Sequence, residues 1–175
     1  MGLHEPDARH GRGDGAARLS APAVEIRSIA DARAAAAAAE ALGLPVMLVS
    51  IPAAAASLGP LAFQAMVDLV RAERPGARIC AAIDCADQEG RVLHAFRAGC
   101  AAAIFHGRPD VAAKLAEIAA GHGATLLTER PATLSLAGAR DPDGACRAWI
   151  RSRSAAPAAA PQDASTHAGS EEEPR

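Results

Sequence analysis

The chain has 175 residues, a length typical of one domain, and its formal net charge is −2. This balance gives no general attraction to nucleic acid or to anionic membrane, so neither is an expected partner. Aromatic residues make up only 2% of the chain, so its core must be built mainly from aliphatic side chains. The first twenty residues carry both charge signs and lack an apolar stretch, and no run is long enough for a membrane helix. We therefore expect a cytoplasmic protein.

Composition divides the chain into three segments. Residues 1–21 are polar and rich in Gly and Arg, and residues 153–175 are a low-complexity run of Ala, Pro, Ser and Glu. Both are expected to be disordered tails, because they have little apolar surface to bury. Residues 22–152 alternate strand and helix signals and are predicted to form one α/β domain.

The domain is predicted to begin with a short strand at 23–27. Ser28 can then cap a helix, with Asp31 three residues later in the capping-box position, and Gly43 ends that helix. The apolar run at 45–51 is typical of a strand buried on both faces, as in a parallel sheet.

The same alternation continues to the end of the domain. Further helices are predicted over 61–73, 91–98 and 109–120 and from about 141 onward, and further strands over 78–84, 101–106 and 124–128. About five strands joined by helices through short loops indicate a parallel sheet with right-handed crossovers. Two architectures fit this pattern, half of a (β/α)8 barrel or a flavodoxin-like open sheet.

In both architectures ligands bind at the carboxyl ends of the strands. The side chains expected there are those of Ser50, Asp84, Cys85, His106 and Glu129. Asp84 could be a general acid or base, or it could cap a loop. His106 ends the strand expected beside that of Asp84, so the two could pair, or His106 could be an ordinary solvated histidine. Ser50 could simply satisfy loop amides.

Two further features of this edge have both a functional and a structural interpretation. Arg108 follows Gly107, where the amides of a helix N-terminus could hold an anion. Cys85 could be a metal ligand or a reactive thiol, or a small half-buried residue. The other cysteines, Cys80, Cys100 and Cys146, form no C-x-x-C pair, and we expect free thiols in a reducing compartment.

From about residue 24 to 131 the sequence resembles the N-terminal half of the barrel of class II, metal-dependent fructose-bisphosphate aldolases. In that family a strand closes on His-x-Asp-His-Gly, and a later strand closes on Asp-Gly-Ser. Asp84 falls on the catalytic aspartate, and Gly107 on the glycine of Asp-Gly-Ser. The further matching positions are Gly59, Phe63, Pro75, Ala95, Gly99 and Glu129. The joint register of these weak motifs carries the resemblance.

The departures from the family pattern bear most on function. Cys85 stands where the family has a zinc-binding histidine, Ala82 stands at the histidine before it, and His106 stands at the aspartate before Gly107. Leu127 replaces the first glutamate of the family's Glu-Gly-Glu motif. No four further strand–helix units follow Pro131 to supply the remaining ligands. A metal-dependent aldolase needs about three protein ligands and an open position.

The resemblance therefore implies an aldolase-like domain that is catalytically silent and binds a small anionic metabolite or a protein partner. Ser50, His106, Gly107, Arg108 and Glu129 would contact the ligand, and no cofactor is expected. The alternative is a metal-dependent lyase or isomerase acting on a sugar phosphate. It would use Asp84 as acid or base and zinc near Cys85 and His106.

The edges of a sheet of about five strands would be exposed, because closing a barrel at this strand tilt takes eight. We expect the strands at 24–26 and 124–128 to be these edges and the two apolar runs between them to be central. The strand at 124–128 would be covered either by the segment 133–150, with Trp149 as anchor, or by a second copy in a homodimer.

Overall fold

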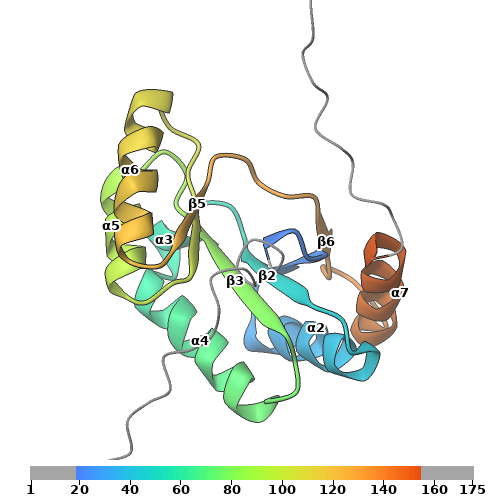
Figure 1. The fold of residues 1–175 in the computed structure, drawn as a ribbon. Helices are drawn as coiled ribbons and strands as arrows, with labels where there is room; N and C mark the ends of the chain where they lie inside the picture. Colours follow the sequence, from blue (N-terminus) through green and yellow to red (C-terminus); the bar gives the residue numbers. More distant parts are fainter. Residues whose placement is uncertain (1–18, 155–175) are drawn as a thin grey trace, which may run out of the picture.

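The computed structural model describes residues 19–154, so most of the predicted tails, 1–21 and 153–175, lies outside the described residues. The predicted strands and helices are present in the predicted order (Figure 1). Two further elements were not predicted: a short helix at Ala54–Ser57, and a strand at Thr133–Ser135 that follows the preceding strand with no helix between them. The strands are β1 (Ala23–Ile26), β2 (Val46–Ser50), β3 (Ile79–Asp84), β4 (Ala102–Ile104), β5 (Thr125–Leu127) and β6 (Thr133–Ser135). The helices are α2 (Ile29–Leu42), α3 (Ala54–Ser57), α4 (Pro60–Glu73), α5 (Glu89–Arg97), α6 (Pro109–Gly121) and α7 (Pro142–Ser154).

Local signals explain where the first of these helices begins and ends. The Ser28 hydroxyl accepts a hydrogen bond from the Asp31 amide at 3.3 Å, and the Asp31 carboxylate accepts one from the Ser28 amide at 3.1 Å. This is the predicted capping box. Gly43 ends α2 with φ at 63°, in the left-handed region that glycine enters without steric cost.

The six strands form one all-parallel open sheet in the order β5-β4-β3-β2-β1-β6, which confirms the predicted α/β class. The sequence did not predict β6, because three residues are too few to show a strand period. Since β6 pairs with β1, the expectation that β1 is an edge strand is wrong. The edges are β5, as expected, and β6, while β2 and β3 are central.

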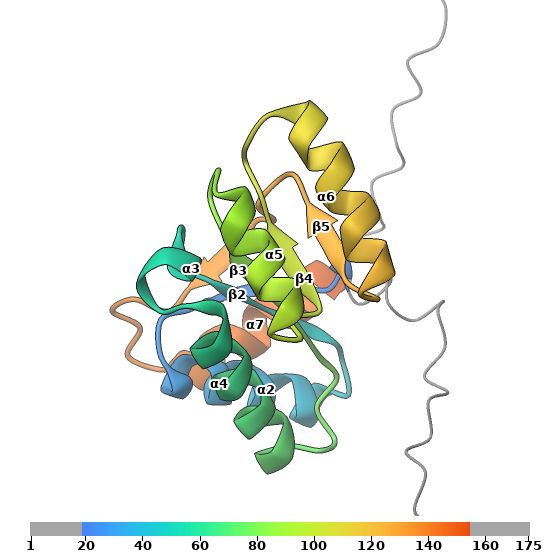
Figure 2. The same cartoon turned by 90° about the vertical axis from the view of Figure 1, so that its left-hand side faces the viewer.

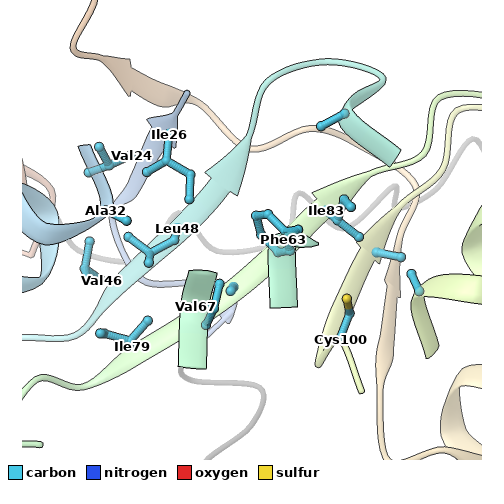
Figure 3. Packing of buried hydrophobic residues seen from close by; sticks show 14 of the residues in the cluster. Val24, Ile26, Ala32, Val46, Leu48, Phe63, Val67, Ile79, Ile83 and Cys100 are labelled. Carbon is cyan, nitrogen blue, oxygen red and sulfur yellow. The ribbon is translucent and has the colours of Figure 1, made fainter. Parts of the chain in front are cut away.

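The helices pack on one face of this sheet. Alternate strand residues, such as Val24, Leu48 and Ile83, face the helices and join their apolar side chains in one core with Phe63 and Val67 of α4 (Figure 3). Figures 1 and 2 show the helices lying around the outside of the strands. An arrangement with helices on one face is that of a barrel wall, whereas doubly wound sheets carry helices on both faces.

None of the helices α2–α7 contributes a side chain to the opposite face of the sheet. Its strand residues form a second cluster, and most of them are small: Ala23, Met47, Val49, Cys80, Ala82, Ala102 and Ile104. Leu19 and Ala21 pack against this cluster from the chain segment that leads into β1. The packed domain therefore begins before residue 22, and it runs on to Ser154 at the end of α7.

The connection between the two edge strands shows that the sheet is strongly curved. In a flat sheet β5 and β6 would lie five strand spacings apart, or about 24 Å. The six Cα steps from Leu127 to Thr133 reach at most about 21 Å. The strands must therefore curl, with the helices on the convex side. In Figure 1 the chain crosses above the strands from β5 to β6.

The last helix, α7, covers β1 and α2 rather than the edge strand β5. It packs against α2, and the Trp149 indole Nε1 donates a hydrogen bond to the Ala23 carbonyl at 2.9 Å. The expectation that the segment 133–150 folds over β5 is therefore wrong. Among residues 19–154, no helix has the length and apolar character needed to cross a membrane.

Candidate functional site

Asp84 lies at the carboxyl end of β3 and is buried, with only 1% of its surface exposed. Its Oδ1 accepts hydrogen bonds from the amides of Ala53 at 3.0 Å and Ala86 at 2.9 Å. Ala53 and Ala86 have φ values of 55° and 52°, and no other non-glycine residue that the structure describes has a positive φ. Such backbone costs of the order of 1 kcal/mol and persists where the surroundings hold it. Asp84 thus organises the loops after β2 and β3.

Arg130 engages the other oxygen of Asp84. It lies in the crossover from β5 to β6, and its Nη1 donates to Asp84 Oδ2 at 2.8 Å. Its Nη2 donates to Glu25 Oε2 at 3.0 Å and to the Ser50 carbonyl at 2.6 Å. The side chain of Arg130 is 19% exposed, so the guanidinium closes the space in front of Asp84.

The environment keeps Asp84 ionised. Burial by itself raises the pKa of Asp84, but the amides of Ala53 and Ala86 and the guanidinium of Arg130 outweigh it and hold that pKa below its ordinary value. A carboxylate with a lowered pKa and two occupied oxygens is a poor general acid or base at neutral pH. The geometry therefore favours the loop-organising role for Asp84.

Ser50 and Glu25 complete the cluster at the strand ends. The buried Ser50 hydroxyl accepts a hydrogen bond from the Asp84 amide at 2.9 Å and donates one to the Ile51 carbonyl at 3.0 Å. Glu25 Oε1 accepts a hydrogen bond from Arg27 Nη2 at 3.1 Å, and Glu25 Oε2 pairs with Arg130. These residues come from β1, β2 and β3, which are neighbours in the sheet.

His106 reaches Asp84 as the strand order predicts. Its Nε2 lies 3.5 Å from Asp84 Oδ2, and 41% of its side chain is exposed. His106 also borders a cavity of about 560 Å³ between α6 and the end of β5, together with Gly107 and Glu129. A Cβ at Gly107 would overlap the ring of Phe105, so only glycine fits there without a shift. The apolar part of the cavity wall is formed by Phe105, Pro109, Ala112, Ala113 and Ala116.

Two of the predicted site residues, Arg108 and Cys85, do not line this cavity. Arg108 is largely exposed and pairs with Asp110, with Nη2 to Oδ2 at 2.6 Å. Cys85 is buried in the helix-facing core, where burial raises the pKa of its thiol to about 12. No group of three His, Cys, Asp or Glu side chains within the described range could hold a metal ion. The side chains described around Asp84 therefore supply too few ligands for a zinc site.

Sequence reasoning missed Glu25 and Arg130. Glu25 is the one charged residue in a four-residue strand, Ala-Val-Glu-Ile. A carboxylate at such a position needs a cationic partner when it is buried, and this was the available signal. The partner is 105 positions away in the chain, so nothing local points to Arg130.

Acid should weaken the fold through Asp84. Because its pKa is lower in the folded protein, ionised Asp84 stabilises the fold above the ordinary carboxyl pKa. That stability is lost as pH falls below about 4 and through the lowered value. Urea unfolding between pH 3 and 6 should show a smaller pH dependence in Asp84→Asn than in the wild type. Glu73→Gln is the control, since a hydrogen bond from Arg33 also lowers the pKa of Glu73 but this pair is exposed. Equal slopes in all three proteins would contradict the prediction.

The sequence was compared with models of known protein families and with curated proteins. No model of a known protein family matches the chain, and no curated protein is significantly similar to it. The resemblance to class II aldolases therefore rests on the sequence motifs and their spacing.

Proposed function

We propose that the chain is an aldolase-like α/β domain without catalysis of its own, and that it binds a small metabolite or a protein partner. The observation that carries this proposal is the state of Asp84. The residue that would fall on the aldolase catalytic aspartate has both oxygens engaged and a guanidinium in front of it. A substrate would have to displace Arg130 before it could meet this carboxylate.

The cavity beside His106 supports binding of a small molecule. Its volume of about 560 Å³ falls in the range of ligand pockets, and its wall is mostly apolar with a few polar groups. His106 and the amides at the start of α6 are the groups that would meet an anionic part of the ligand. Glu129 on the same wall opposes anions, so the apolar wall would supply much of the binding.

Titration calorimetry with ketose phosphates and with dicarboxylates tests this proposal. We expect binding without turnover, and we expect His106→Ala to weaken that binding at least tenfold. His94→Ala is the matched control, because His94 is an exposed histidine on α5 that does not border the cavity. Turnover of a ketose phosphate, or equal affinity of the two variants, would contradict the proposal.

The alternative is a metal-dependent lyase or isomerase acting on a sugar phosphate. The contact between His106 and Asp84 at the strand ends favours it. The position of Cys85 in the helix-facing core counts against it. Metal analysis of protein purified without a histidine tag separates the two functions: stoichiometric zinc that is lost in Cys85→Ala would support the enzyme.

A homodimer stays part of the proposal. The edge strand β5 has no neighbour on its outer side within residues 19–154, and unpaired strand edges invite pairing. A second copy is the partner that we favour for this edge.

A further inference from the structure

The oxygens around Arg130 form a receptor shaped for a planar cation. They come from the ends of three neighbouring strands: Glu25 of β1, Ser50 of β2 and Asp84 of β3. All three contacts are made by the two terminal nitrogens of one guanidinium, at distances between 2.6 and 3.0 Å. Two carboxylates and a carbonyl arranged around one planar guanidinium match the positions of its N–H donors.

The receptor is held in place by contacts that do not involve Arg130. The amides of Ala53 and Ala86 orient Asp84, and Arg27 holds the far oxygen of Glu25. The Ser50 hydroxyl is fixed between the Asp84 amide and the Ile51 carbonyl. The acceptors should therefore keep their positions when the Arg130 side chain is removed.

The same geometry distinguishes between classes of cation. An ammonium group carries all its donors on one nitrogen, so it cannot span acceptors that Arg130 reaches with two separate nitrogens. Divalent metals need oxygens about 2.0–2.6 Å away in larger number than this cluster supplies. The ligand class that fits is an alkylguanidinium.

We propose that the carboxyl ends of β1, β2 and β3 form a guanidinium-binding site that Arg130 occupies from within the same chain. Five residues of crossover, 128–132, join Arg130 to β5 and β6, and such a tether gives a linked group a millimolar or higher effective concentration. The intact protein thus fills its own site. The crossover excludes other ligands from Asp84, and its release exposes a site for a guanidinium group. This inference is independent of the ligand proposed for the cavity beside His106.

Chemical rescue of Arg130→Ala tests the site. Ethylguanidinium replaces the atoms that this substitution removes. At about 10 mM it should raise the melting temperature of Arg130→Ala by several degrees, because a ligand that binds only the folded state stabilises it. Ethylammonium at the same ionic strength should not, and neither the wild type nor Arg108→Ala should respond. Arg108→Ala is the matched control because it removes an exposed guanidinium that is also paired with a carboxylate.

A second variant ties the rescue to the receptor. Adding Glu25→Gln to Arg130→Ala should reduce the rescue at least tenfold in apparent affinity. If Arg130→Ala does not fold without a ligand, its refolding yield is measured in ethylguanidinium and in ethylammonium. A higher yield in ethylguanidinium is then the expected result. No rescue in either measurement, an equal effect of ethylammonium, or an equal effect on Arg108→Ala would overturn the proposal. Stabilisation by Mn²⁺ in place of ethylguanidinium would also overturn it, in favour of a general cation site.

Discussion

Replacing Arg130 by alanine is expected to lower the free energy of unfolding by about 3–5 kcal/mol, as removal of one partner from a buried ion pair does. The substitution leaves Asp84 and Glu25 without the cation that they share. The side chain of Asp84 is 2% exposed and that of Glu25 is 12% exposed, so water can replace the guanidinium only in part. Urea unfolding followed by circular dichroism at pH 7 measures the loss.

Two comparisons show whether the loss arises from the buried charges. Arg108→Ala also removes an arginine that pairs with a carboxylate, but this pair is exposed, so the free energy of unfolding should change little. A triple variant, Arg130→Met with Asp84→Asn and Glu25→Gln, removes all three charges together. It should recover part of the stability that Arg130→Ala loses, because no buried charge is left unpaired, and Arg27, which loses Glu25, is exposed. A loss in Arg130→Ala no larger than in Arg108→Ala would mean that the cluster contributes nothing to the fold.

Trp149→Ala is expected to destabilise the protein by about 2–4 kcal/mol, somewhat below the cost for a fully buried tryptophan, because Trp149 is half-buried. The indole joins α7 to β1 through its hydrogen bond to the Ala23 carbonyl, and Arg153 stacks over the ring at 4.5 Å. Loss of this anchor should also raise hydrogen exchange in α7 and β6 before the rest of the domain.

Graded substitutions separate the contributions at this anchor. Trp149→Phe keeps most of the apolar area but loses the hydrogen bond, and it should cost about 1 kcal/mol. Arg153→Ala removes an exposed cation–π contact and should cost less than about 1 kcal/mol. If Trp149→Ala were no more harmful than Arg153→Ala, the packing of α7 on α2 alone would hold the helix.

Burial and thiol chemistry also bear on the aldolase-like interpretation. Burial raises the pKa of Cys100 and of Cys146 to about 11, as it raises that of Cys85 to about 12. These three thiols therefore stay protonated at neutral pH and act as small apolar side chains. The chemistry available at the strand ends is that of the Asp84 cluster and His106.

The amino-acid sequence by itself determined the elements whose signals lie within a few residues. The capping box of Ser28 and Asp31, the stop at Gly43 and the apolar runs of β2 and β3 are local, so the helices and central strands could be predicted from them. The meeting of Asp84 and His106 was predictable too, because consecutive strands of such a fold are usually neighbours.

Only the tertiary structure decided what fills the mouth of the sheet. The contacts of Arg130 with Asp84 and Glu25 span 46 and 105 positions in the chain, and no local pattern encodes them. They depend on β6 pairing with β1, and on a curvature that brings the two edge strands within reach of a five-residue crossover. A strand of three residues is too short for its sequence pattern to predict that pairing. Its position follows from the burial of α7 against α2 and of Trp149 against β1, which is a property of the whole packed domain.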